Sequence, residues 1–430
     1  MTFVWDTAKW DQAEWGGRPP GWPGWGDDWA WWYQIGQNGI GGNINLLNPY
    51  IVEARWTTDS HTLGDGCFRG DLQPGTVTIR LWDPLKRLAY MSNKAGAVFA
   101  LYKPTGAAWC WFFESLTKGL YAPGDPLDAD LVWTGTTWPF RFTAPITLNG
   151  MAAQPADSRL TTIVNRLNNN RGNLQIPVTS GAIAAQSQMV AANQADQNGL
   201  FPSWLQEVRN AAPNGVAWLA PGPDTTPPQV GGGTAGHGTL LLTYARWDAA
   251  AQRTLDRSQI IAGPAVSAGI DWLVTMAAWQ AVNAGGATTA LRVTGTALAN
   301  IWGMQGPDQM RLWGDVTATT GAEYAATLAT GNALMAARSD STEQVLDTIT
   351  VQSGVRTRPD GRPGLAAWDP YSHHWLPTDV AVIPPPPGAP PAPTITSLFR
   401  VVKSEHRLTA TIWETTHTIE KYVSAQPLPA

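Results

Sequence analysis

Apolar and polar residues alternate in the first third of the chain. Two sets of side chains alternate along residues 75–84: Val77, Ile79 and Leu81 in one set, and Thr76, Thr78 and Arg80 in the other. A period of two places these sets on opposite faces of a strand, which Asp83 and Pro84 then end. Similar short segments at 96–104 and 107–116 predict that residues 43–144 form a small antiparallel barrel or sandwich.

The pattern changes to a helical period after residue 145. Four apolar side chains recur at spacings of three and four: Leu160, Ile163, Val164 and Leu167. This spacing predicts a helix with one buried face. A second helical segment follows, and a strand is predicted at 216–220. Residues 145–238 are therefore predicted to be an α+β connecting domain with helices lying on a sheet.

The remainder, residues 239–430, is again β-patterned. Strands are predicted near 239–247, 288–298 and 343–354, with an alanine-rich helix at 321–339. A polyproline stretch at 384–393 separates two further β-patterned segments. We expect an insertion between two strands of one domain, although an interdomain linker has the same composition.

Tryptophan marks the beginning of the chain. Five of these residues are candidate contact residues: Trp5, Trp10, Trp15, Trp22 and Trp25. Their spacing gathers them on one side of neither a helix nor a strand, and glycine and proline are frequent among them. Residues 1–42 are predicted to be an irregular arm. Docking onto another subunit and covering the domain's own core both fit this pattern.

Composition narrows the classes of function. Only 14% of the 430 residues are charged, the net charge is −5, and there are 24 Trp, 43 Gly and 34 Pro residues. Stable nucleic-acid binding is not expected, since no basic run supplies the charge that phosphate binding needs. The N-terminus lacks the pattern of a secretory signal, and no apolar stretch reaches the length of a membrane helix, so membrane binding is not expected.

Motifs for catalysis or cofactor binding are not found. The sequence has no nucleophile motif and no P-loop, and no cofactor or catalytic residue is predicted. His406 and His417 would approach each other if their strands pair, but strand-borne histidines more often form hydrogen bonds at a surface than bind zinc. Carboxylates suited to a sugar hydrolase occur as Asp27, Asp28, Asp125, Asp128 and Asp130. Solvated turns explain them better than catalysis does, and glycan binding without catalysis remains an alternative.

Three passages resemble those of a known family of proteins. They are VWDTAKWDQAEW at 4–15, LQPGTVTIRLWDPLKRL at 72–88, and the succession of elements from 290 to 420 that ends in FRVVKSEHRLTATIWETTHTIE. In this order they resemble minor tail proteins of long-tailed phages (siphoviruses) of actinobacteria, of the kind that forms the baseplate hub. The chain has Trp302-Gly303 where the family usually has Tyr-Gly, and Pro377-Thr378-Asp379 in place of Pro-Gly-Asp.

The resemblance implies a mainly β fold with two small antiparallel β-barrels joined by helix-on-sheet segments. It also implies a homotrimer at the virion tail tip that is assembled in the host cytoplasm, joins the tail tube to the tip and gates DNA passage. Its partners would be the distal tail protein, the tape measure protein and other minor tail or tail-fibre proteins, with the host cell surface as a further candidate. The alternatives are a distal-tail adaptor forming a hexameric ring and a tail protein that binds host cell-wall glycan.

Overall fold

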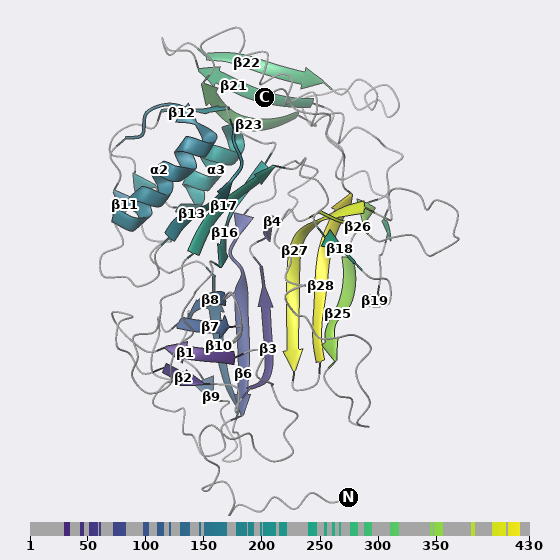
Figure 1. The fold of residues 1–430 in the computed structure, drawn as a ribbon. Helices are drawn as coiled ribbons and strands as arrows, with labels where there is room; N and C mark the ends of the chain where they lie inside the picture. The colour runs from purple at the N-terminus through teal and green to yellow at the C-terminus, as the bar shows by residue number, and fades with distance from the viewer. Residues whose placement is uncertain are drawn as a thin grey trace, which may run out of the picture.

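The fold is mainly β-structure with two described helices (Figure 1). The computed structural model describes residues 30–34, 44–46, 51–58, 60–61, 72–82, 98–102, 110–115, 120–121, 130–137, 146–147, 150–169, 178–186, 188–192, 198–199, 201–211, 215–221, 240–246, 253–255, 260–262, 266–267, 276–282, 288–294, 310–317, 345–346, 348–355, 380–382, 398–409 and 412–421.

A 14-stranded sheet dominates the fold. Its main path runs in the order β19 (Ile260–Ala262), β25 (Thr348–Val355), β28 (Ile412–Lys421), β27 (Leu398–Thr409), β3 (Ile51–Thr57), β6 (Thr76–Trp82), β10 (Asp130–Thr136), β8 (Cys110–Ser115), β7 (Val98–Tyr102), β1 (Ala30–Gln34) and β2 (Ile44–Leu46). Off this path, β9 (Leu120–Tyr121) pairs with β10, and β26 (Val380–Val382) pairs with both β27 and β18 (Arg253–Thr254). Neighbouring strands of the main path are antiparallel.

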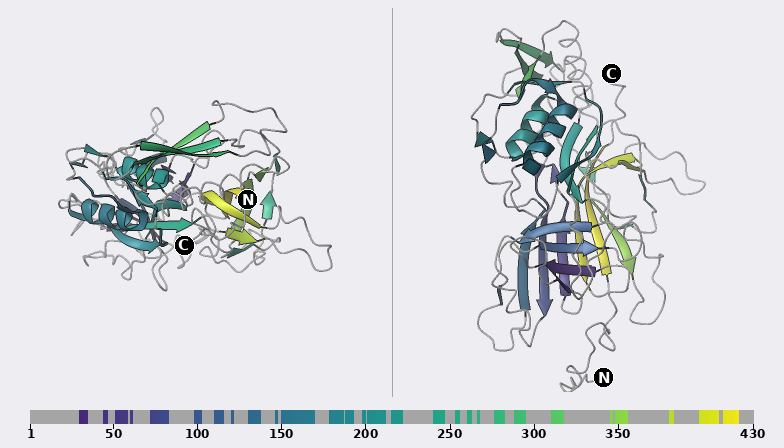
Figure 2. Two further views of the ribbon diagram at one scale, coloured as in Figure 1. Left: turned by 90° about the horizontal axis from the view of Figure 1, so that it is seen from above. Right: turned by 60° about the vertical axis from the view of Figure 1, so that its left-hand side comes forward.

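Strands from the two ends of the chain meet in the middle of this sheet. Residues 405–409 of β27 pair with 53–57 of β3, and we call this pairing the seam. Figure 1 shows the yellow C-terminal strands beside the purple N-terminal ones. Strands from both regions that were expected to form barrels thus pair in one large, mainly antiparallel sheet, and no closed barrel is found among the described residues. Strands β7 and β1 run at a steep angle to the long strands β3 and β6, as the right-hand view of Figure 2 shows.

A helical unit follows the first strands, as the spacing of its apolar residues predicts. Helix α2 (Ala156–Asn169) buries all four side chains that the pattern places on one face, and α3 (Phe201–Ala211) buries Trp204, Leu205 and Val208. Both helices contact the sheet β13 (Val178–Ile183), β17 (Leu240–Arg246) and β16 (Gly215–Pro221). Neither of these two helices is long and apolar enough to cross a membrane.

Smaller sheets complete the described structure. One five-stranded sheet has the order β12 (Gln154–Pro155), β14 (Met189–Val190), β23 (Met310–Thr317), β21 (Met276–Val282) and β22 (Thr288–Thr294). Three two-stranded pairs are β11 (Ile146–Thr147) with β15 (Asn198–Gly199), β20 (Val266–Ser267) with β24 (Val345–Leu346), and β4 (Ser60–His61) with β5 (Leu72–Gln73). The predicted helix at 321–339 lies outside the described residues.

The predicted arm and the polyproline stretch are only partly described. Strand β1 lies within residues 1–42 and pairs with β7 and β2, which corrects the expectation of irregular structure for residues 30–34. Residues 384–393 lie outside the described residues, and the strands on either side of them, β26 and β27, pair with each other.

One face of the 14-stranded sheet around the seam, which we call the seam sheet, is buried. This burial explains why apolar and polar residues alternate along its strands. On β6, Val77, Ile79 and Leu81 are buried as predicted, while the other set is exposed. Trp56 of β3 and Trp133 of β10 belong to the same buried face. On the C-terminal strands the core consists of Leu255, Ile349, Val351, Phe399, Val401 and Ile419.

A glycine is required where the chain enters β6. A Cβ atom on Gly75 would lie 2.3 Å from the backbone oxygen of Thr57 and 2.9 Å from Cγ2 of Thr137. The carbonyl of Gly75 also accepts a hydrogen bond from the backbone N–H of Thr137 at 2.9 Å. Since the blocking atom belongs to the backbone of β3, it cannot rotate away.

We therefore expect Gly75→Ala to lower the free energy of unfolding by about 2 kcal/mol, because the added methyl group forces β3 and β6 apart. Thermal unfolding followed by circular dichroism measures this loss. Thr78→Ala, at an exposed position of the same strand, is the control and should change stability by less than about 0.5 kcal/mol. Equal melting temperatures for wild type and Gly75→Ala would contradict the close approach.

Candidate functional site

The outward face of the seam sheet carries polar side chains on strands from both ends of the chain. We call it the polar face, and it spans β25, β28, β27, β3, β6 and β10. The charged residues of this face whose side chains the structure describes are Glu53, Arg55, Arg80, Lys403, Glu405, Arg407 and Glu414. Its threonines are Thr57, Thr76, Thr78, Thr134, Thr348, Thr350, Thr409, Thr416 and Thr418. An antiparallel sheet with one solvated face has this composition.

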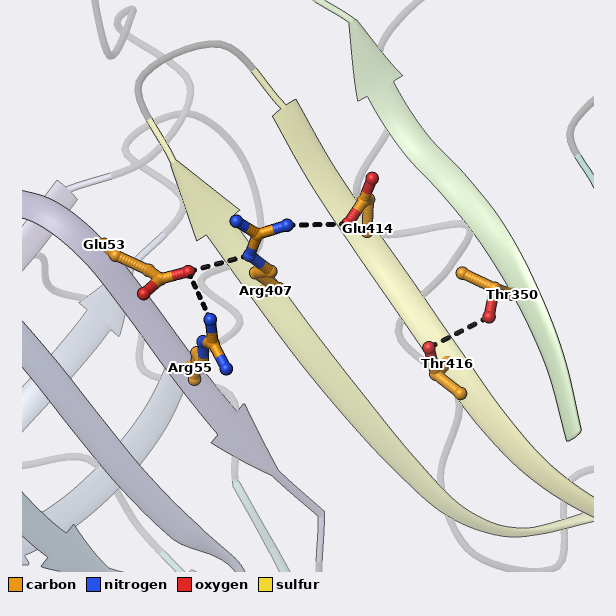
Figure 3. Close-up of polar contacts among 6 residues, drawn as sticks. All are labelled: Glu53, Arg55, Thr350, Arg407, Glu414 and Thr416. Atoms are coloured by element: carbon orange, nitrogen blue, oxygen red, sulfur yellow. Dashed lines mark hydrogen bonds and ion pairs between the residues drawn. The ribbon is translucent and has the colours of Figure 1, made fainter. Parts of the chain in front are cut away.

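Glu53 lies at the centre of an ion-pair cluster on this face (Figure 3). One of its carboxylate oxygens, Oε1, accepts hydrogen bonds from Nε of Arg407 at 2.7 Å and from Nη2 of Arg55 at 2.9 Å. Arg407 also donates from Nη1 to Oε2 of Glu414 at 3.3 Å. The cluster therefore joins β3, β27 and β28 across the seam.

Threonine hydroxyls extend the polar face on both sides of the cluster. Oγ1 atoms of Thr350 and Thr416 lie 3.1 Å apart between β25 and β28 (Figure 3). On the N-terminal side, the backbone N–H of Thr76 donates to Oγ1 of Thr57 at 2.9 Å. Lys403 pairs with Glu405, its neighbour along the same face of β27.

The opposite face of the seam is buried and also contains polar groups. The rings of Trp56 and His406 stack with centroids 4.8 Å apart and planes inclined by 8°. Nδ1 of His406 lies 3.1 Å from Oγ1 of Thr415, and Nδ1 of His417 lies 2.7 Å from Oγ of Ser404. An aromatic contact on the buried face and an ion pair on the polar face thus both connect β3 with β27.

Backbone hydrogen bonds continue the seam beyond the paired residues. The N–H of Thr58 donates to the carbonyl of Ser404, and the N–H of Ser404 donates to Oγ1 of Thr58, each at 2.9 Å. Thr58 and Ser404 are both buried, so these bonds satisfy polar groups that water does not reach. These bonds extend the seam to the residues next to the paired ones, Thr58 and Ser404.

The surroundings of Glu53 shift its ionisation. Burial raises the pKa of its carboxyl, but the hydrogen bonds and charges of Arg407 and Arg55 lower it by more, so the pKa lies below its ordinary value of 4.5. The hydrogen bond to Glu53 also raises the pKa of Arg407. These shifts favour the charged forms of both groups, and Glu53 is ionised at neutral pH.

This depressed pKa makes the seam sensitive to acid. A carboxyl whose pKa is lowered by folding contributes stability above its unfolded pKa, and that contribution is lost as the pH falls through the folded pKa. We expect wild type to be more stable than Glu53→Gln by about 1 kcal/mol at pH 7, and the difference to vanish well below pH 4.5. Chemical denaturation of both proteins at several pH values measures it. A difference that is the same at pH 7 and pH 3 would contradict the assignment.

The predicted contact residues are not placed by the structure. Trp5, Trp10, Trp15, Trp22 and Trp25 lie outside the described residues, and so do Asp27, Asp28, Asp125 and Asp128. Asp130 begins β10, where it pairs in register with Trp82.

The two strand histidines lie on paired strands, as expected, but their environment differs from the prediction. Both are buried, whereas the sequence pattern placed them at a surface. Each lies beside the hydroxyl of a neighbouring strand. Within the described part of the chain, no group of three His, Cys, Asp or Glu side chains is placed to hold a metal ion.

The ion-pair cluster around Glu53 was not predicted from the sequence. The available signal is an acid and an arginine two positions apart, in Glu53-Ala54-Arg55 and again in Glu405-His406-Arg407. Alternation places each such pair on one face of its strand. Nothing in the sequence indicates that these two strands pair.

Comparisons with known proteins identify the fold. No family model matches the chain, and no curated protein sequence matches it. Among solved structures, the tail protein from Neisseria meningitidis MC58 is similar with a TM-score of 0.51 and 11% identity, over 92% of this chain and 97% of that one. The prophage MuSo2 43 kDa tail protein from Shewanella oneidensis gives a TM-score of 0.50 and 11% identity, over 92% of this chain and 100% of that one. The chain shares the fold of these tail proteins over nearly its whole length.

Proposed function

We propose that this chain is a structural virion protein of the phage tail tip, a baseplate hub or minor tail protein of a long-tailed phage that infects actinobacteria. It acts by joining the tail tube to the tip and by leaving a passage for DNA. The observation that carries the proposal is the seam, which joins strands from both ends of the chain into one wall with a single polar face. The fold shared with two tail proteins supports it.

The shape of the seam sheet suits a ring of identical subunits. Its main path ends in two different strands, β19 and β2, so a contact between the two sides of neighbouring copies is heterologous. Heterologous contacts close into rings when the rotation permits. We propose that three copies form this ring, with the polar faces turned toward a central channel.

The composition of the polar face agrees with a hydrated channel surface. Protein interfaces have an apolar, often aromatic centre. Among the large apolar side chains that the structure describes, those exposed are Val132 and Ile261. Val132 lies on β10, the last strand of the polar face on one side, and Ile261 lies on β19, next to β25 on the other side. The centre of the face is charged or hydroxylated, as a channel that passes DNA requires.

The proposed role is mechanical, without catalysis. A general acid or base works best with a pKa near the working pH. At the centre of the polar face, the ion pairs of Glu53 and Arg407 move both pKa values away from neutrality. This supports a structural role for the charged residues of the face.

The proposed partners follow from the position at the tail tip. They are the distal tail protein, the tape measure protein and other minor tail or tail-fibre proteins. The tryptophan-rich residues 1–28 would provide the docking arm, because large aromatic side chains anchor permanent interfaces.

Electron cryomicroscopy of intact particles tests the proposal by counting subunits. Three copies at the tip, with the polar face toward the channel, are the expected result. Six copies in one ring would instead identify a distal-tail adaptor. Purified protein that hydrolysed peptidoglycan above background would refute the structural role.

A further inference from the structure

The charges of the polar face nearly balance. Its cations are Arg55, Arg80, Lys403 and Arg407, and its anions are Glu53, Glu405 and Glu414. These described side chains leave one net positive charge, and register places the acidic Asp130 of β10 on the same face of the sheet as Arg80. Arg55 and Arg407 have side chains that are 61% and 51% exposed, so both guanidinium groups can be reached from solution.

Glu53 is the anion that engages both Arg55 and Arg407. Its side chain is 21% exposed, and its Oε1 accepts from Arg55 and Arg407 together (Figure 3). Register also places Arg80 of β6 directly opposite Glu53. One carboxylate therefore lies among three arginines contributed by β3, β6 and β27.

We propose that the polar face contacts the phosphate backbone of duplex DNA, and that Glu53 keeps this contact weak by holding Arg55 and Arg407 in ion pairs within the protein. The inference rests on the proposed function, which turns this face toward the channel. A surface over which DNA must move needs to be hydrated without binding phosphate tightly.

The chemistry of arginine explains why such a restraint is needed. Its planar guanidinium offers several N–H donors in a geometry that matches phosphate oxygens as well as carboxylates. An exposed arginine without a carboxylate would exchange its water for DNA phosphate and release counterions. Glu53 competes with phosphate for the same N–H groups, namely Nε of Arg407 and Nη2 of Arg55.

Glu414 provides a weaker restraint from the neighbouring strand. Its Oε2 lies 3.3 Å from Nη1 of Arg407, against 2.7 Å for the bond from Nε to Glu53. Loss of Glu414 would free one N–H group of Arg407, whereas loss of Glu53 frees groups on both arginines. The two glutamates should therefore differ in their effect on DNA binding.

The test measures DNA binding by the purified full-length chain. Fluorescence anisotropy with a labelled duplex of random sequence would compare wild type with Glu53→Gln in 50 mM salt. We expect about tenfold tighter binding by Glu53→Gln, and a salt dependence of log K steeper by about one unit, because about one further phosphate is engaged. Glu414→Gln should give a smaller gain, and it serves as the second variant if Glu53→Gln does not fold.

Glu405→Gln is the matched control. It removes the same charge from the same face but leaves both arginine pairs intact, since the partner of Glu405 is Lys403. A smaller gain than that of Glu53→Gln is expected. An equal gain would overturn the assignment to Glu53, because net charge alone would then explain binding.

Further outcomes separate this inference from the proposed function. Unchanged DNA affinity in folded Glu53→Gln and Glu414→Gln, or wild-type binding as tight as that of Glu53→Gln, overturns the inference. If Glu53→Gln instead alters only subunit association, the face contacts protein and the inference also fails. In each of these cases, a count of three subunits per tail would leave the proposed function standing.

Discussion

Trp56→Ala should lower the free energy of unfolding by about 3–5 kcal/mol, as expected for truncating a fully buried tryptophan. Trp56 is 1% exposed and stacks on His406 across the seam, so the substitution removes both core volume and the aromatic contact between β3 and β27. Thermal unfolding followed by circular dichroism would show a melting temperature lower by roughly 3–6 °C for a chain of 430 residues.

Trp133→Ala is the matched control for this prediction. Trp133 is 0% exposed, but it lies on β10 and pairs in register with Ile79 of β6, away from the seam. Both variants should be destabilised. Hydrogen exchange should rise first at amides 405–409 in Trp56→Ala and between β6 and β10 in Trp133→Ala. The same exchange pattern in both would mean that Trp56 does not fasten the seam.

Removal of residues 1–28 should abolish the assembly of infectious tails while leaving the sheet folded. The deletion takes away all five candidate contact tryptophans but keeps β1, which pairs with β7 and β2. A tryptophan seated in a neighbouring subunit contributes about 2 kcal/mol or more to an interface, so loss of several should prevent docking. Plaque titre in a complementation assay and the melting temperature of the purified protein measure the two effects.

Two further variants sharpen the deletion experiment. Removing residues 1–34 also eliminates β1 and exposes the edge of β7, so it should lower the melting temperature as well. Unfolding of the shorter deletion would show that the tryptophans cover the chain's own core. Retention of cell-wall polysaccharide that is lost in Trp22→Ala and Trp25→Ala would favour glycan binding by the arm.

The sequence predicted elements whose faces differ in polarity. Strand β6 and helix α2 were found because each buries apolar residues at its own period. Strand β28 is harder to interpret, since its buried face contains Thr415 and His417 beside Ile419. Inward hydroxyl and imidazole groups break the apolar alternation, although Nδ1 of each histidine forms a hydrogen bond with a hydroxyl group between β27 and β28.

The long-range pairing of β27 with β3 could not be predicted in the same way. Glu53 and Arg407 are 354 positions apart, and the charges of each strand, taken alone, indicate only a solvated face. Register between distant strands depends on which edges remain open after local hairpins form. Each end of the chain, taken by itself, shows only its local strand pattern, so the sequence does not predict that the two ends pair in one sheet.

The seam also constrains how the protein is made. At about 5–20 residues per second, a ribosome needs roughly 20–70 s to synthesise the chain between Glu53 and Arg407. During that delay the nascent β3 presents an open edge that could recruit a strand from another molecule. Glu53 and Arg55 put charge on that edge from the moment it emerges. Residues that later join the halves of the protein thus also discourage aggregation while translation continues.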